Sequence, residues 1–124
     1  MIEPHRILIV EDEEVIRETV ATIFMEEGYD VRTAENGQEA LRVVQEWLPT
    51  VIVLDLMMPV MDGWTFREMQ RGLAGPVASV PVILLSGARN MRSSAELLGA
   101  ADALAKPFDL EDLLATVERV VAVT

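Results

Sequence analysis

The chain has no cysteine, one histidine and few aromatic residues, namely two tryptophans, one tyrosine and three phenylalanines among 124 residues. Without cysteine it has no disulfide framework and no thiolate chemistry. Its longest apolar runs span only a few residues, whereas a membrane-spanning helix needs about 18. The first residues lack the charged and apolar blocks of a signal peptide. We therefore expect one cytoplasmic domain over residues 1–124, with no membrane association.

Positive charge is also scarce. Ten lysines and arginines stand against 21 aspartates and glutamates, for a net charge of -11. Phosphate backbones are bound by clustered cations, so we expect no direct nucleic-acid binding by this chain. An acidic surface instead suits protein partners with basic faces.

Five short apolar runs alternate with stretches of helical periodicity, a pattern typical of an α/β domain. The expected strands are residues 6–10, 29–34, 51–54, 82–85 and 102–105. The expected helices are residues 13–27, 38–47, 65–71, 90–98 and 110–121, with 72–80 as a loop.

The first, third and fourth runs are apolar throughout, as expected of parallel strands with helices on both faces. The second and fifth are shorter and more polar, which places them at the edges. These features predict a doubly wound, five-stranded parallel sheet of order 2-1-3-4-5, flanked by five helices. In such folds ligands bind beyond the carboxyl ends of the strands, at the switch point between strands one and three.

Polar residues stand at the ends of these runs. Glu11 and Asp12 follow the first strand, Asp55 the third and Ser86 the fourth, and Lys106 follows the fifth. Two carboxylates about 5 Å apart repel by roughly 3 kcal/mol at an effective dielectric near 20, and a hard divalent cation such as Mg²⁺ relieves this repulsion. Asp55, at the centre, would then be a metal ligand or a nucleophile toward phosphorus.

Four motifs in the chain resemble the receiver domain of two-component response regulators, which has a CheY-like, flavodoxin-like fold. The resemblance covers the whole chain, in order and with the family's spacing. The motifs are Val10-Glu11-Asp12; Asp55-Leu56-Met57-Met58-Pro59 with Met61-Asp62-Gly63; Leu85-Ser86-Gly87-Ala88; and Lys106-Pro107-Phe108.

The resemblance implies that Asp55 accepts a phosphoryl group from the phosphohistidine of a histidine kinase or phosphotransfer protein. Glu11, Asp12, Asp55 and the backbone carbonyl of Met57 would hold Mg²⁺. Transfer would depend mainly on positioning and on cations.

The resemblance further implies that Ser86 hydrogen-bonds the phosphoryl group, that Lys106 pairs with it, and that the Lys106–Pro107 peptide is cis. The chain would be a phosphorylation-dependent switch that catalyses only its own phosphoryl transfer and slow dephosphorylation. It would act on a downstream protein partner or an output domain. The start at Met1 and the complete last helix fit a stand-alone protein, although a piece of a longer regulator would look the same. The kinase, the signal and homodimer formation on phosphorylation stay open.

The chain departs from the family pattern at three positions. Ala103 stands where an aromatic residue usually lies, three positions before the lysine, so we expect activation to be transmitted through the loops after strands three and four and through helix 90–98. Gly87 stands where alanine is more common, which adds backbone freedom. Met57 and Ala88 are both apolar and flank the expected path of a hydrolytic water, which predicts an acyl phosphate that is not unusually short-lived.

Two other functions fit parts of the pattern. A receiver-like protein-interaction module, not regulated by phosphorylation, would agree with Ala103. A phosphohydrolase acting through an aspartyl phosphate usually carries a second aspartate two residues after the nucleophile, and here that residue is Met57. Each candidate also has a purely structural interpretation: Asp55 as a turn cap, Asp12 as a helix N-cap, Glu11 as a solvated side chain, Ser86 as a turn hydroxyl, and Lys106 as an ion-pair partner.

Overall fold

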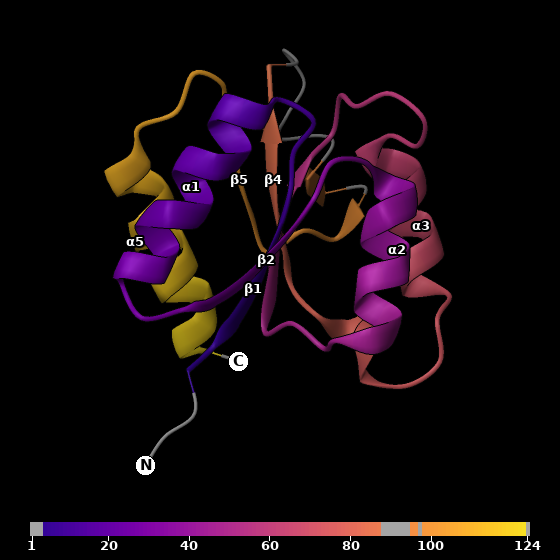
Figure 1. The fold of residues 1–124 in the computed structure, drawn as a ribbon. Coiled ribbons are helices and arrows are strands. Elements are labelled where there is room, and N and C mark those ends of the chain that lie inside the picture. The colour runs from indigo at the N-terminus through magenta and orange to yellow at the C-terminus, as the bar shows by residue number, and fades with distance from the viewer. Residues whose placement is uncertain (1–3, 88–94, 97, 124) are drawn as a thin grey trace.

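The computed structural model describes residues 4–87, 95–96 and 98–123, which form a parallel sheet between two layers of helices (Figure 1). The strands are β1 (Arg6–Val10), β2 (Asp30–Ala34), β3 (Val51–Asp55), β4 (Val82–Ser86) and β5 (Asp102–Ala105). The helices are α1 (Glu14–Glu26), α2 (Gly37–Glu46), α3 (Gly63–Arg71) and α5 (Leu110–Ala122), with a 3-10 helix, η1 (Pro76–Ser79), before β4.

The sheet has the predicted order β2-β1-β3-β4-β5, and all four pairings are parallel. The register aligns Val10 with Leu54 and Leu54 with Leu84, so the central strands end nearly level. Residues that follow these strands therefore emerge side by side at one edge of the sheet.

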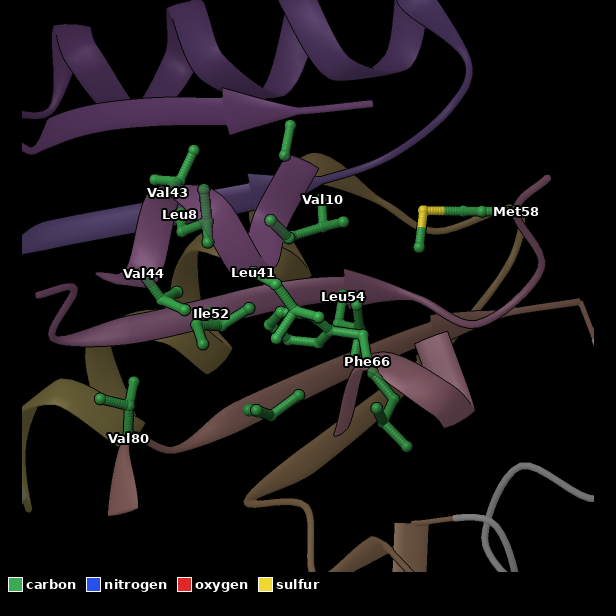
Figure 2. Close-up of a cluster of buried hydrophobic side chains, with 14 of the residues drawn as sticks. Leu8, Val10, Leu41, Val43, Val44, Ile52, Leu54, Met58, Phe66 and Val80 are labelled. Carbon is green, nitrogen blue, oxygen red and sulfur yellow. The ribbon is translucent and has the colours of Figure 1, made fainter. Parts of the chain in front are cut away.

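Two apolar clusters cover the two faces of the sheet. The inner strands β1, β3 and β4 are almost fully buried and send alternate side chains to each cluster, as strands covered on both faces do. On one face Leu8, Ile52 and Leu54 pack with Leu41 of α2 and Phe66 of α3 (Figure 2). On the other face the strands pack against α1 and α5.

Helix starts follow local capping signals. Side-chain oxygens of Asn36, Asp62 and Asp109 accept backbone N–H groups at the first turns of α2, α3 and α5, as N-caps do. The helix α1 is different, because its N-cap residue is Glu13 and makes no side-chain cap hydrogen bond. The interpretation of Asp12 as the N-cap of this helix is therefore wrong.

Several expected boundaries also need correction. The second strand begins at Asp30 and is as long as the inner strands, although it lies at an edge. The helix α3 begins at Gly63, two residues before the expected start, because Asp62 caps it. The segment 72–80 contains η1 and is not entirely a loop. The described residues of the expected helix 90–98, namely 95, 96 and 98, are helical, and the rest of it lies outside the described ranges. No helix in these ranges is long and apolar enough to cross a membrane.

A buried arginine joins α3 to the turn before β5. The side chain of Arg67 donates hydrogen bonds to the carbonyls of Leu98 at 3.0 Å and Gly99 at 3.1 Å, and to the side-chain oxygen of Gln70 at 2.7 Å. Gln70 is itself fully buried and donates to the carbonyl of Val80 at 3.1 Å. Burial lowers the pKa of Arg67, and the nearby charge of Arg71 lowers it further. Among the described residues no carboxylate pairs with Arg67, and its hydrogen bonds go to carbonyl oxygens.

Replacing Arg67 with methionine should lower the free energy of unfolding by about 2 kcal/mol, because buried carbonyl acceptors lose their donor. Urea denaturation checks this value. Arg42→Met removes the same charge from an exposed pair with Glu46 and should change stability by less than about 0.5 kcal/mol. An Arg67→Met protein as stable as the Arg42→Met control would contradict the structural role of this network.

Candidate functional site

The structure brings the predicted site residues together at the carboxyl edge of the sheet. Glu11 and Asp12 follow β1, Asp55 is the last residue of β3, Ser86 is the last residue of β4, and Lys106 follows β5. The side chains of Glu11, Asp55 and Ser86 are almost fully buried. Such burial of polar groups is costly unless they are paired.

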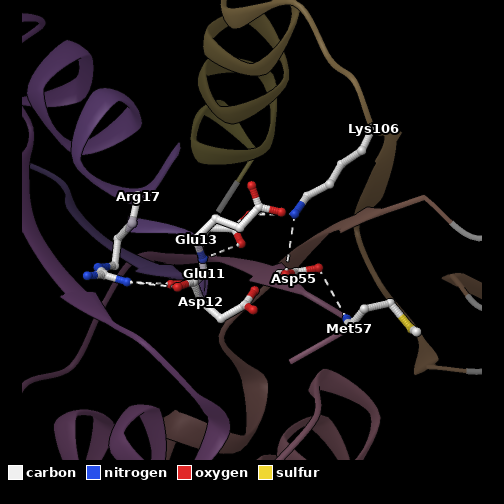
Figure 3. A network of polar contacts seen from close by, with 7 residues as sticks. All are labelled: Glu11, Asp12, Glu13, Arg17, Asp55, Met57 and Lys106. Atoms are coloured by element: carbon white, nitrogen blue, oxygen red, sulfur yellow. Dashed lines mark hydrogen bonds and ion pairs between the residues drawn. The ribbon is translucent and has the colours of Figure 1, made fainter. Parts of the chain in front are cut away.

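Lys106 is the cation of this cluster. Its ammonium lies 2.6 Å from a carboxylate oxygen of Glu11 and 3.3 Å from one of Asp55 (Figure 3). The other oxygens are also engaged: Met57 N–H donates to Asp55 at 3.1 Å, and Glu13 N–H donates to Glu11 at 3.1 Å. The structure thus excludes a merely solvated Glu11.

Three carboxylates crowd the same space. Oxygens of Glu11, Asp12 and Asp55 lie within 4.8 Å of one another. Burial, followed by the charge of Glu11 and a hydrogen bond with Asp12, raises the pKa of Asp55 to about 7, and the Met57 N–H and Lys106 only partly oppose this. An oxygen-only cluster with excess negative charge fits a hard divalent cation such as Mg²⁺, which would be held by these three side chains.

The neighbouring carboxylates also raise the pKa of Lys106, which favours its charged form. Burial alone would lower the pKa of Lys106, but its hydrogen bond to Glu11 and the charge of Asp55 raise it above the ordinary value. Lys106 therefore stays an ammonium at neutral pH. A fixed positive charge at this edge can bind an anionic group placed near Asp55.

The backbone links the lysine to the serine. Lys106 N–H donates to the carbonyl of Ser86 at 2.9 Å, so the ends of β4 and β5 are held together. The peptide between Lys106 and Pro107 is cis, as the family resemblance implied.

The loop after Asp55 is tightly constrained. A Cβ atom on Gly63 would lie 2.5 Å from the carbonyl oxygen of Asp55, so only glycine fits at the start of α3. In the same loop Val60 has φ of 71°, which is strained for a β-branched residue. The side chains of Met57 and Val60, in the same loop, are exposed.

Sequence reasoning did not single out Arg17. Its guanidinium reaches back from α1 to the carbonyls of Glu11 at 3.0 Å and Asp12 at 3.4 Å (Figure 3). No motif predicts this contact, because an arginine among acidic residues on a helix is usually a solvated charge.

The position expected to carry an aromatic ring is small and half-buried. Ala103 lies on β5 opposite Leu84 and packs against the cluster shown in Figure 2. Ala88 and most of the helix 90–98, which the sequence implicated in hydrolysis and activation, lie outside the described residues.

Residues 7–118 match the family described as the response regulator receiver domain. The chain belongs to this family. As a receiver domain it is a signalling domain of two-component systems and not an enzyme in the usual sense.

Curated relatives of this receiver domain are regulatory proteins. It is 36% identical over 118 residues to the regulatory protein AtoC of Escherichia coli, covering 93% of this chain and 25% of that protein. It is 38% identical over 112 residues to the response regulator MprA of Mycobacterium tuberculosis, covering 89% of this chain and 47% of that protein. The chain therefore spans between a quarter and about half of the length of these relatives.

Solved receiver structures share the fold. The receiver domain of the Francisella response regulator 1452 has a TM-score of 0.85 and 31% identity, covering 95% of this chain and 97% of that one. The chemotaxis protein CheY4 of Vibrio cholerae has a TM-score of 0.85 and 33% identity, covering 94% and 98%.

The raised pKa of Asp55 predicts a pH-dependent stability without metal. The folded protein keeps this proton between about pH 4 and pH 7, where the unfolded chain has lost it. This stabilisation is complete at low pH and is lost as the pH rises through 7. Asp55→Asn has no such proton, so its stability relative to the wild type should increase by about 2 kcal/mol from pH 5 to pH 8.

Urea denaturation in EDTA at both pH values measures this difference. Asp30→Asn, at an exposed position on β2, is the matched control. Its stability relative to the wild type should change between the two pH values by less than half as much as that of Asp55→Asn. If the difference in the free energy of unfolding between Asp55→Asn and the wild type is the same at both pH values, Asp55 does not titrate near neutrality.

Proposed function

We propose that this receiver domain is a Mg²⁺-dependent phosphorylation switch, with Asp55 as the phosphoacceptor and a histidine kinase or phosphotransfer protein as the donor. The observation that carries the proposal is the position of Asp55, which is buried against Lys106 and within reach of two further carboxylates. A strand-end carboxylate that only capped a turn would need neither neighbour.

Glu11, Asp12 and Asp55 would hold the metal, with the carbonyl of Met57 as a further ligand. The metal would offset the excess negative charge and bind oxygens of the phosphoryl group. In the transfer, an Asp55 oxygen forms a bond to phosphorus while the bond from phosphorus to the donor imidazole nitrogen breaks, and the imidazole leaves. The product is an acyl phosphate on Asp55.

Lys106 and Ser86 would stabilise this product. Lys106 is already 3.3 Å from Asp55, so a phosphoryl oxygen on that carboxylate can take the place that Glu11 now occupies at the ammonium. Ser86 ends the neighbouring strand, and its backbone is tied to that of Lys106. Its hydroxyl would donate a hydrogen bond to a second phosphoryl oxygen.

The phosphorylated state would change binding to a downstream protein partner or output domain. Because Ala103 cannot supply a ring that changes position, transmission through the loops after β3 and β4 remains our prediction. An interaction module that is not regulated by phosphate is the second candidate, and Ala103 is the observation in its favour.

Intact-mass measurement after incubation with Mg²⁺ and acetyl phosphate tests the proposal. The wild type and Asp30→Asn should each gain one phosphoryl group that hydroxylamine removes, as it removes acyl phosphates. Asp55→Asn should gain none, and EDTA should prevent the reaction. Absence of an adduct on the wild type would favour the interaction module, and an equal adduct on Asp55→Asn would contradict Asp55 as the phosphoacceptor.

Hydrolysis of the adduct tests the role of Met57, which is exposed and two residues after Asp55. Its thioether cannot orient an attacking water, whereas an amide or carboxylate can. Met57→Asn and Met57→Glu should therefore lose the phosphoryl group faster, by roughly tenfold. Met69→Glu, at another exposed position, is the control. An unchanged rate in the Met57 variants would contradict this role.

A further inference from the structure

Arg17 contacts the loop that carries two of the candidate metal ligands. One guanidinium nitrogen donates to the carbonyl of Glu11 at 3.0 Å and, at a longer 3.4 Å, to the carbonyl of Asp12. These two carbonyls belong to the peptide groups on either side of the Asp12 Cα atom. A single side chain thus restrains both backbone dihedrals of Asp12, and with them the direction of its carboxylate (Figure 3).

The usual role of a helical arginine does not account for this placement. Glu13 and Glu14 stand four and three residues before Arg17 and would be natural ion-pair partners at the surface. In the ranges that the structure describes, Arg17 forms no ion pair. Its guanidinium turns back toward the site.

The direction of the Asp12 carboxylate depends on its backbone more than that of the Glu11 carboxylate does. The carboxylate of Glu11 is held at both oxygens, by Lys106 and by the N–H of Glu13. A hydrogen bond between the Asp12 and Asp55 carboxylates needs a proton on one of them, so the two repel each other once both are ionised. The helix α1 begins without a side-chain cap, so the turn lacks that restraint as well.

We infer that Arg17 is a positioning residue for the metal site, which holds the Asp12 carboxylate toward Asp55 through these two carbonyls. The inference rests on the proposed function, because it takes Mg²⁺ as the ion that the cluster binds. It assigns to Arg17 no contact with the metal or with the phosphoryl group.

The sign of the effect on Mg²⁺ affinity separates positioning from simple electrostatics. Arg17 is a cation near the site, so removing its charge should tighten the binding of another cation if charge alone mattered. Loss of a group that orients a ligand should instead weaken binding, by roughly tenfold or more. The two accounts predict opposite changes.

Isothermal titration of the full chain with Mg²⁺ makes this comparison. Arg17→Met should bind Mg²⁺ roughly tenfold more weakly than the wild type. Arg17→Lys should recover most of the affinity, since an ammonium can donate to the same carbonyls. Arg42→Met is the matched control, because it also changes the net charge from -11 to -12 but lies on the exposed face of α2. Its affinity should stay within about twofold of the wild type.

Phosphorylation provides a second readout. At saturating Mg²⁺, Arg17→Met should form the acetyl phosphate adduct at nearly the wild-type rate, because the defect lies in affinity.

Equal or tighter Mg²⁺ binding by Arg17→Met, or Mg²⁺ binding by Arg17→Lys as weak as that by Arg17→Met, would overturn the inference. If Arg17→Met does not fold, Arg17→Ala decides it: Mg²⁺ binding at least about threefold weaker than in the wild type supports positioning, and equal or tighter binding contradicts it. If the wild type forms no adduct but Arg17→Met still binds Mg²⁺ more weakly, the phosphoacceptor proposal fails and the role of Arg17 stands.

Discussion

The repulsion among three carboxylates at the carboxyl edge of the sheet is the constraint on which the rest of the site depends. Glu11 and Asp55 are almost completely removed from water, and Asp12 lies beside them. Two features of the fold make this arrangement tolerable, namely the ammonium of Lys106 and the backbone N–H groups of Glu13 and Met57. Burial together with the charge of Glu11 raises the pKa of Asp55 to about 7, and the remaining negative charge makes the site suitable for a divalent cation. Stability without metal and affinity for metal thus both depend on the same buried carboxylates.

Most of the fold follows from the sequence because the signals agree with one another. Apolar runs such as residues 51–54 have no polar face, so they belong at the centre of a parallel sheet, and polar residues placed directly after them must meet at one edge. Asp62 and Asp109 stand where helix caps are needed, and both are caps in the structure. Asp12 has the same chemistry but a different place, because the turn after β1 directs its carboxylate toward Asp55 and leaves α1 without a side-chain cap. Local chemistry alone could not distinguish these cases.

Contacts of arginine side chains with backbone carbonyls were the part that the sequence could not reveal. Arg17 and Arg67 both look like ordinary helical charges, yet each donates to backbone carbonyls of another segment. Their partners are carbonyls, which every residue carries, so no pairing of side-chain types marks them. The close approach of Gly63 to Asp55 is similar, because a glycine after an aspartate also fits an ordinary turn. The contacts of Arg17 and Gly63 fix the segments that follow β1 and β3 at the site, whereas those of Arg67 lie at the opposite edge of the sheet, before β5 begins.

The identity of the modified residue is the central claim, and borohydride reduction tests it most directly. Borohydride reduces an acyl phosphate on aspartate to homoserine, and peptide sequencing by mass spectrometry then locates that residue. After treatment with Mg²⁺ and acetyl phosphate, homoserine should appear at position 55 and should be absent when EDTA is present. Homoserine at position 12, a reduced glutamate at position 11, or no reduced residue at all would contradict the assignment of Asp55 as the phosphoacceptor.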